Sequence, residues 1–351
     1  MASSTITEGQ SALSGSRQGA LIGGLGFDRV MALLCAWFVG GLFLDGWAHG
    51  HGLVDKTFFT PWHAVLYSGY AVCALALLVA IGLNRRRGAS WSQAIPAGYL
   101  LSLMGAPLFL VAGVGDLIWH TLFGFEVGIE PLLSPTHLLL AFSGLLIMSG
   151  PLRATWGRSE PLGSNSWRTL LPALISLLAV FSVFTFFTNF AHPLVDYRLV
   201  SLASGNGNKS WGAASILLQA ALLMGVSLFA LRRWRLPFGA FTLLFTINAV
   251  LESVLPSHNQ YWLMLCALLA GLVADLLNRN LRPAPSRLEA LRLFAFVVPV
   301  VYYLGYFITL MLLGGITWSI HLWLGSSVMA GVVGLVLSYI LLPPASPVVN
   351  N

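Results

Sequence analysis

Two stretches of this chain place aspartate and histidine between long apolar runs. Residues 42–69 read LFLDGWAHGHGLVDKTFFTPWHAVLYSG, and residues 113–144 read GVGDLIWHTLFGFEVGIEPLLSPTHLLLAFSG. Both contain Asp-x-x-x-His, then a loop, then Ser/Thr-Pro-x-His. The side chains that could bind a metal or take part in catalysis are Asp45, His49 and His63 in the first stretch and Asp116, His120 and His137 in the second.

The spacing predicts how each set is positioned. An aspartate and a histidine four residues apart share one face of a helix. Thr60-Pro61 and Ser134-Pro135 are typical of an N-cap followed by proline in the first helical position. A helix that starts there carries the second histidine in its first turn. Each hairpin is therefore expected to bring two imidazoles and one carboxylate together just below the outer membrane surface.

Two neutral imidazoles and one carboxylate suit a divalent transition metal and leave coordination positions open. Copper, zinc and iron(II) all accept this ligand set. The stretches contain no cysteine, which argues against a relay that handles only Cu(I). In the alternative interpretation, each Asp–His pair only stabilises its hairpin by hydrogen bonding.

The motif resembles the copper-site pattern of the membrane C subunit of particulate methane and ammonia monooxygenases. In that family, Asp-x-x-x-His is followed after a similar gap by a second histidine at a helix start. The resemblance covers about a sixth of the chain, and it implies copper ligands at Asp45, His49 and His63. The same pattern at Asp116, His120 and His137 would form a second site, although its loop is longer.

The composition indicates which elements position these residues. Of 351 residues, 57% are hydrophobic and 9% are charged, whereas soluble domains carry about 25% charged residues. The sequence predicts an all-α, polytopic integral membrane helical bundle over 27–343, between a disordered tail at 1–26 and a short tail at 344–351. About ten transmembrane helices are expected, near 28–48, 61–83, 95–121, 135–152, 168–190, 211–231, 237–255, 259–277, 289–313 and 318–342.

The basic residues predict the orientation. Fifteen of the 18 lysine and arginine residues lie at alternate breaks between the apolar runs, and basic loops stay in the cytoplasm. Both termini are then cytoplasmic, in the bacterial inner membrane. The helices form five hairpins, near 28–83, 95–152, 168–231, 237–277 and 289–342. All eight histidines fall on the outer side.

Other polar residues on that side are secondary candidates. Asn248, Glu252 and His258 form a degraded copy of the motif, and His192 and His321 lie at further helix ends. We treat His192, His258 and His321 as lower-ranked metal ligands. Glu126, Glu130 and Glu252 are candidate proton shuttles.

These features favour a copper-dependent, monooxygenase-like oxidoreductase that acts on a small apolar or lipidic substrate. The alternatives are a zinc-dependent intramembrane lipid hydrolase, with Asp45 or Asp116 as base and Ser68 or Ser143 nearby, and a metal transporter that uses Asp275 or Asn248. A scaffold subunit of a membrane complex and a homo-oligomer stay open. The expected partner is the lipid bilayer and not nucleic acid, since the arginine clusters are orientation signals.

Overall fold

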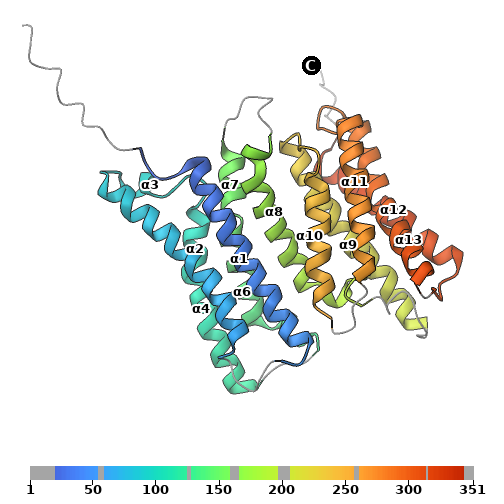
Figure 1. Cartoon of the computed structure of the whole chain (residues 1–351), viewed down its shortest axis with the longest axis horizontal. Helices are drawn as coiled ribbons and strands as arrows, with labels where there is room; N and C mark the ends of the chain where they lie inside the picture. The colour runs from blue at the N-terminus through green and yellow to red at the C-terminus, as the bar shows by residue number, and fades with distance from the viewer. Residues whose placement is uncertain are drawn as a thin grey trace, which may run out of the picture.

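The structure is a computed structural model that describes residues 20–53, 59–124, 128–158, 166–196, 206–256, 261–313 and 315–343. These parts of the chain form helices and no strands (Figure 1). The elements are α1 (Gly24–Gly50), α2 (Pro61–Arg86), α3 (Trp91–Ala94), α4 (Leu100–Phe123), α5 (Glu130–Leu133), α6 (Pro135–Met148), α7 (Gly150–Gly157), α8 (Trp167–Phe187), η1 (Asn189–Ala191), α9 (Asn206–Arg233), α10 (Ala240–Val254), η3 (Tyr261–Leu263), α11 (Met264–Leu281), α12 (Leu288–Leu313) and α13 (Ile320–Leu341).

Among the described residues, nine helical segments are long and apolar enough to cross a membrane, which is the pattern of a membrane protein. The seventh expected span, 237–255, is the exception. It forms α10, which has 15 residues and at 1.5 Å per residue extends about 22 Å, short of the roughly 30 Å hydrocarbon core. A left-handed Gly239 precedes this helix, and Pro256 follows its end.

Two other expected spans differ in their bounds. The third begins at Leu100 and not near residue 95, because Pro96 and the positive φ of Gly98 separate it from the short helix α3. The fourth is divided into α6 and α7, and Pro151 lies in the first turn of α7. Together these two helices still form one candidate span.

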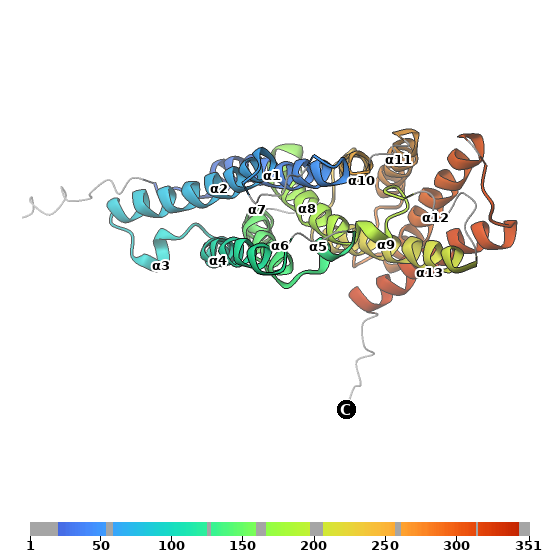
Figure 2. The same ribbon diagram turned by 90° about the horizontal axis from the view of Figure 1, so that it is seen from below.

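The helices surround two hydrophobic cores that meet at α8. One core lies among α1, α2, α4 and α6, and the other among α9 to α13. Helix α8 contributes Ala179, Val183 and Phe186 to the first and Leu174 and Phe181 to the second. Seen from below, α1 and α2 form one layer, α4 and α6 form another, and α8 lies between them and the C-terminal helices (Figure 2).

Glycines let α1 and α2 approach closely. A Cβ atom at Gly41 would lie 2.7 Å from the Leu66 Cα, and one at Gly69 would lie 2.6 Å from the Phe38 Cα. Gly41 lies one turn before Asp45 on α1. The close contact of the two backbones therefore holds the first Asp-x-x-x-His face against the start of α2.

A second close contact joins α4 to α6, where a Cβ at Gly105 would lie 2.8 Å from the Leu146 Cβ. The two helix pairs are linked through tyrosines of α2. The Tyr70 hydroxyl donates to the Ala106 carbonyl at 2.9 Å, and the Tyr67 hydroxyl lies against Gly113.

The opposite end of the molecule carries the arginines. The side chain of Asp28, which is buried, forms an ion pair with Arg158 and accepts a hydrogen bond from the Tyr99 hydroxyl at 2.8 Å. Basic residues also occupy the last turns of α2, α9 and α11. The polar chemistry at the two ends is therefore different, with arginine at one and the Asp/His sets at the other.

Candidate metal centres

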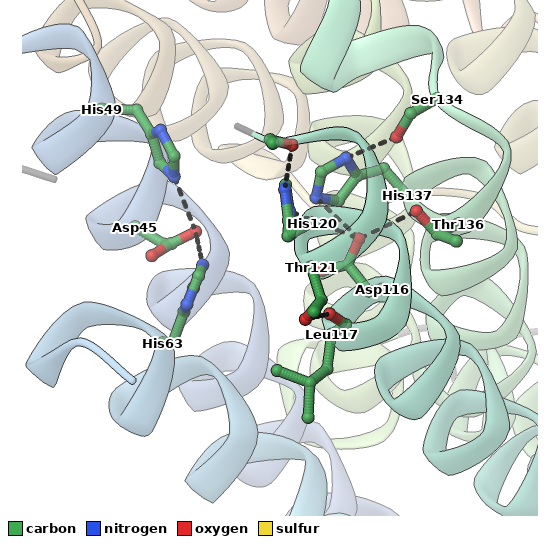
Figure 3. A network of polar contacts seen from close by, with 11 residues as sticks. Asp45, His49, His63, Asp116, Leu117, His120, Thr121, Ser134, Thr136 and His137 are labelled. Atoms are coloured by element: carbon green, nitrogen blue, oxygen red, sulfur yellow. Dashed lines mark hydrogen bonds and ion pairs between the residues drawn. The ribbon is translucent and has the colours of Figure 1, made fainter. Parts of the chain in front are cut away.

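Asp45, His49 and His63 converge and are called here the first trio (Figure 3). The Asp45 Oδ2 atom lies 3.8 Å from the His49 Nε2 and 3.4 Å from the His63 Nε2. Asp45 and His49 come from the last turns of α1, and His63 comes from the first turn of α2. Both imidazoles therefore present the same nitrogen to one carboxylate oxygen.

The start of α2 has the predicted cap. The Thr60 hydroxyl accepts a hydrogen bond from the His63 backbone N–H at 3.1 Å, and proline follows Thr60. The first trio opens to the surface on one side, since the His49 side chain is 40% exposed while those of Asp45 and His63 are 13% and 12% exposed. The other Asp45 oxygen, Oδ1, is buried without a hydrogen-bond partner among the described residues.

Asp116, His120 and His137 form the second trio, at the end of α4 and the start of α6. The Asp116 Oδ1 lies 3.6 Å from the His120 Nε2 and 3.3 Å from the His137 Nε2. This trio is more enclosed, because the side chains of Asp116 and His120 are 3% and 7% exposed. The ring centroids of the two imidazoles are 5.5 Å apart.

Neighbouring polar groups orient the second trio. The Thr136 hydroxyl donates to the Asp116 Oδ1 at 2.8 Å. The His120 Nδ1 lies 3.3 Å from the Gly124 carbonyl, and the His137 Nδ1 lies 2.7 Å from the Ser134 Oγ. A ring whose Nδ1 carries the proton for such a contact keeps the Nε2 lone pair free, which is the form that binds a metal.

Ser134 differs from its predicted role. It occupies the N-cap position of α6, but its side chain makes no hydrogen bond to the helix backbone. Its hydroxyl contacts the His137 imidazole instead. The sequence was right about where α6 begins and wrong about the partner of this hydroxyl, because an imidazole three residues away competes with the backbone N–H.

The spacing in both trios suits a small metal ion. In each, the three ligand atoms lie within 4.8 Å of one another. Ligands about 2.0–2.1 Å from a tetrahedral ion are separated by roughly 3.3 Å, and the observed Nε2–Oδ distances run from 3.3 to 3.8 Å. Only small side-chain movements are needed to close either trio around an ion.

The two trios face each other, one on the α1–α2 pair and one on the α4–α6 pair (Figure 3). Tyr67 of α2 lies by both sets. Its ring is 6.4 Å from the His63 ring, centroid to centroid, and its hydroxyl lies against Gly113, three residues before Asp116 on α4. The trios therefore form one polar region at this end of the bundle.

The lower-ranked ligands lie elsewhere. His192 is buried after η1 in the C-terminal half, and His321 is exposed at the start of α13. His51, which the first stretch also contains, bonds the Trp47 carbonyl of its own helix through Nδ1 at 2.8 Å. His258 falls outside the described residues. None of the described three joins a trio.

The proposed proton shuttles are equally dispersed. Glu130 is exposed at the start of α5, in the connection between α4 and α6. Glu252 is fully buried on α10, among helices of the C-terminal half. Glu126 lies outside the described residues.

Sequence reasoning missed Tyr67 and Thr136. Both positions carry a recognisable signal, because Tyr67 lies four residues after His63 on the same helix face and Thr136 directly precedes His137. Their roles depend on which helix lies opposite, and that is a property of the folded chain.

Comparisons with known proteins found no matching family model, no similar curated protein and no similar solved structure. The resemblance of the two motifs to monooxygenase C subunits therefore stays a prediction. What is established is an all-helical, membrane-type chain with two Asp/His/His groups whose geometry could hold metal ions.

Proposed function

We propose that this chain is an integral membrane metalloprotein in which each trio binds one divalent transition metal ion. The observation that carries the proposal is the convergence, twice, of two imidazole Nε2 atoms on one carboxylate oxygen at the same end of the bundle. Intramembrane ionisable groups are expensive and are a mark of function. Two imidazoles and a carboxylate also leave coordination positions open for a substrate or water.

Copper is the favoured metal, and oxidation of a small apolar or lipidic substrate is the favoured reaction. The motif resemblance supports copper. A bound copper ion would supply the redox chemistry, while the chain's own residues hold and orient the ligands. Of these, Thr136 fixes the carboxylate of Asp116, and Ser134 and the Gly124 carbonyl fix the two rings. Zinc and iron fit the same ligands, and the identity of the bound metal distinguishes them from copper.

The hydrolase alternative is ranked lower on the geometry of its serines. The Ser68 hydroxyl donates to the Val65 carbonyl at 2.7 Å and accepts from Trp37, and Ser143 is buried with its hydroxyl on the Leu139 carbonyl. Both hydroxyls are therefore engaged within or between helices.

The transporter alternative is ranked lower for a similar reason. Asp275, one of its two candidate residues, accepts hydrogen bonds from the Phe241 and Thr242 backbone and from the Thr242 hydroxyl. These hydrogen bonds attach α11 to the start of α10, so the carboxylate of Asp275 has a structural role. The other candidate, Asn248, is likewise hydrogen-bonded to side chains of α8.

We further propose that the chain lies in the cell's inner membrane with both termini in the cytoplasm and the trios facing outward. Helix α10 is short, but it still runs from the arginine-rich end to the trio end, since the Phe238 carbonyl accepts a hydrogen bond from Trp167 at the start of α8 and Leu255 lies against Gly50 at the end of α1. The number of passes between the two ends therefore stays even. The distribution of arginine supports this orientation, since the last turns of α2, α9 and α11 are basic and lie at the end opposite the trios.

The test is elemental analysis of the detergent-purified chain beside the variants His49→Ala, His120→Ala and the double variant. We expect each single variant to lose the ion of one trio and the double variant to lose both. His321→Ala is the matched control, since this histidine is exposed and outside both trios. Full metal content in the double variant would end the proposal, and the identity of the metal separates copper from zinc and iron.

A further inference from the structure

The two trios share one sequence pattern but differ in how far they are enclosed. The most exposed ligand of the first trio, His49, has a side chain 40% exposed, whereas the most exposed ligand of the second, His137, is 21% exposed. The two carboxylates differ in the same direction, with Asp45 at 13% and Asp116 at 3%. An ion held by the first trio is therefore easier to reach from outside the protein.

A hydroxyl orients the carboxylate of the second trio and has no counterpart in the first. The Thr136 hydroxyl donates to the Asp116 Oδ1 at 2.8 Å (Figure 3). Thr136 directly precedes the second histidine of its motif, and Trp62 occupies the same place in the other motif. The Trp62 ring packs edge-on against the Trp47 ring, with centroids 5.6 Å apart. An aromatic contact thus replaces the hydroxyl in the first trio.

The carboxylate of Asp45 has a second oxygen available. Its Oδ2 atom faces both imidazoles, while its Oδ1 atom is buried without a hydrogen-bond partner among the described residues. Carboxylates bind metal ions through one oxygen or through both. An unheld carboxylate can change between these two modes. Each change from two oxygens to one opens a coordination position for an incoming ligand.

The imidazoles of the two trios also differ in their support. Both rings of the second trio make an Nδ1 contact, one of them to the Ser134 hydroxyl at 2.7 Å and the other to a backbone carbonyl at 3.3 Å. In the first trio, the described residues provide no such contact for the His49 Nδ1. The Thr60 hydroxyl, which corresponds to Ser134, accepts from the His63 backbone N–H instead. The second trio is therefore the better oriented one.

We propose that the first trio is an exchangeable metal site and that the second trio retains its ion. This inference rests on the proposed function, because it requires that both trios bind metal. Partners that orient metal ligands strengthen binding, and they gather around the second trio. The exchange partner is a small ligand with oxygen or nitrogen donors that approaches past the exposed His49 side chain. Exchange needs no oxidant or reductant, since every ligand atom keeps its electron pair.

The test compares the release of copper(II) from two variants of the full chain in lipid nanodiscs. His120→Ala retains only the first trio, and His49→Ala retains only the second. Each variant is loaded with copper(II) alone, freed of excess metal and mixed with excess EDTA, and the copper that remains on the protein is measured over time. We expect release from the His120→Ala variant to be at least about tenfold faster, the lower end of the effect of outer ligand partners.

A matched pair of substitutions isolates the missing hydroxyl. In the His120→Ala background, Trp62→Thr and Trp62→Val both remove the indole, and only Trp62→Thr adds a hydroxyl at the place that Thr136 has in the other motif. The two new side chains have nearly the same shape, so an effect on folding is common to both. We expect copper release from the Trp62→Thr variant to be slower than from the Trp62→Val variant.

Equal release rates from the two single-trio variants, each loaded with one ion, would overturn the inference and leave the proposed metal binding intact. Faster release from the second trio would overturn it as well. Equal rates in the two Trp62 variants would contradict the role given to the missing hydroxyl. Absence of bound copper in both single-trio variants would instead end the proposed function, and the inference with it.

Discussion

The Oδ1 atom of Asp116 faces both imidazoles of the second trio and accepts a hydrogen bond from the Thr136 hydroxyl. Groups that orient a metal ligand in this way contribute to affinity even though they do not touch the ion. We expect Thr136→Val to weaken metal binding at the second trio about 10–100-fold, by analogy with other outer ligand partners. Competitive titration against a chromogenic chelator, in a His49→Ala background that retains only this trio, measures the effect.

Thr121→Val is the matched control for that titration. Thr121 lies on the same helix pair, close to the second trio in Figure 3, but its hydroxyl donates to the Leu117 carbonyl of its own helix. The variant that combines His49→Ala with Thr121→Val should bind metal with the same affinity as the His49→Ala variant. Equal affinity in the Thr136 and Thr121 variants would show that Thr136 does not orient the ligand.

His192 gives a prediction about pH. Burial lowers its pKa to about 3, while an imidazole in the unfolded chain titrates near 6.5. The unfolded state therefore takes up the proton first, so this contribution to stability is complete above about pH 6.5 and declines as the pH falls toward 3. We expect the melting temperature to fall less between pH 7 and pH 5 in metal-free His192→Gln than in metal-free wild type.

His321→Gln serves as the reference, because this imidazole is exposed at the start of α13. Its melting temperature should follow wild type across the same pH range. A His192→Gln profile parallel to wild type would mean that the buried ring is not the source of the acid sensitivity.

At the level of elements, the approach of α1 to α2 sets the geometry of the first trio. A methyl group at Gly41 would lie 2.7 Å from the Leu66 Cα, and overpacking of this kind costs roughly 1–3 kcal/mol. We expect Gly41→Ala to separate the two helices and to lower metal affinity at the first trio while the second trio keeps its ion. Metal content after mild chelation, in variants that retain one trio, measures this.

Gly40→Ala isolates the clash. It makes the same chemical change one residue earlier on α1, where a Cβ atom meets nothing within 4 Å. Any gain in helix propensity is common to both substitutions. Loss of the first ion in Gly40→Ala as well would assign the effect to α1 itself and not to its contact with α2.

The sequence predicted the elements around the trios well because their signals are local. Thr60-Pro61 and Ser134-Pro135 mark the starts of α2 and α6, and both helices begin there. Asp-x-x-x-His spacing depends only on helical periodicity, so the convergence of Asp45 with His49 is also a local property.

Features that depend on helix-to-helix packing were not predictable. The two trios face each other because Tyr67 and Tyr70 join α2 to α4, and no spacing in the sequence specifies that pair. The seventh expected span is short and contains Glu252, which marks it as one of the two weakest from sequence alone, but the exact limits of α10 depend on its surroundings. Its apolar run looks like a span, but Gly239 and Pro256 limit the helix, and its polar residues find partners in the other helices.

At the scale of the whole molecule, the two ends of the bundle carry different chemistry. We expect a cysteine at Ile129, beside the second trio's helix pair, to react with a membrane-impermeant thiol reagent in intact cells. A cysteine at Ser92, at the arginine-rich end, should react only after the cells are opened. Both side chains are exposed, and the expected difference follows from the basic end being cytoplasmic.

The native chain is a suitable background for this labelling, since Cys35, Cys73 and Cys266 are all buried. Wild type should therefore remain unlabelled under both conditions. The reverse pattern of labelling would invert the orientation and place the trios on the cytoplasmic side, although it would leave their geometry unchanged.

The most direct test of the central claim is a diffraction experiment on metal-loaded protein, with data collected on both sides of the metal's absorption edge. The account predicts one anomalous peak in each trio, between the carboxylate and the two Nε2 atoms of Asp45, His49 and His63 and of Asp116, His120 and His137. Metal bound only at other positions, with both trios closed by hydrogen bonds between their own side chains, would contradict it.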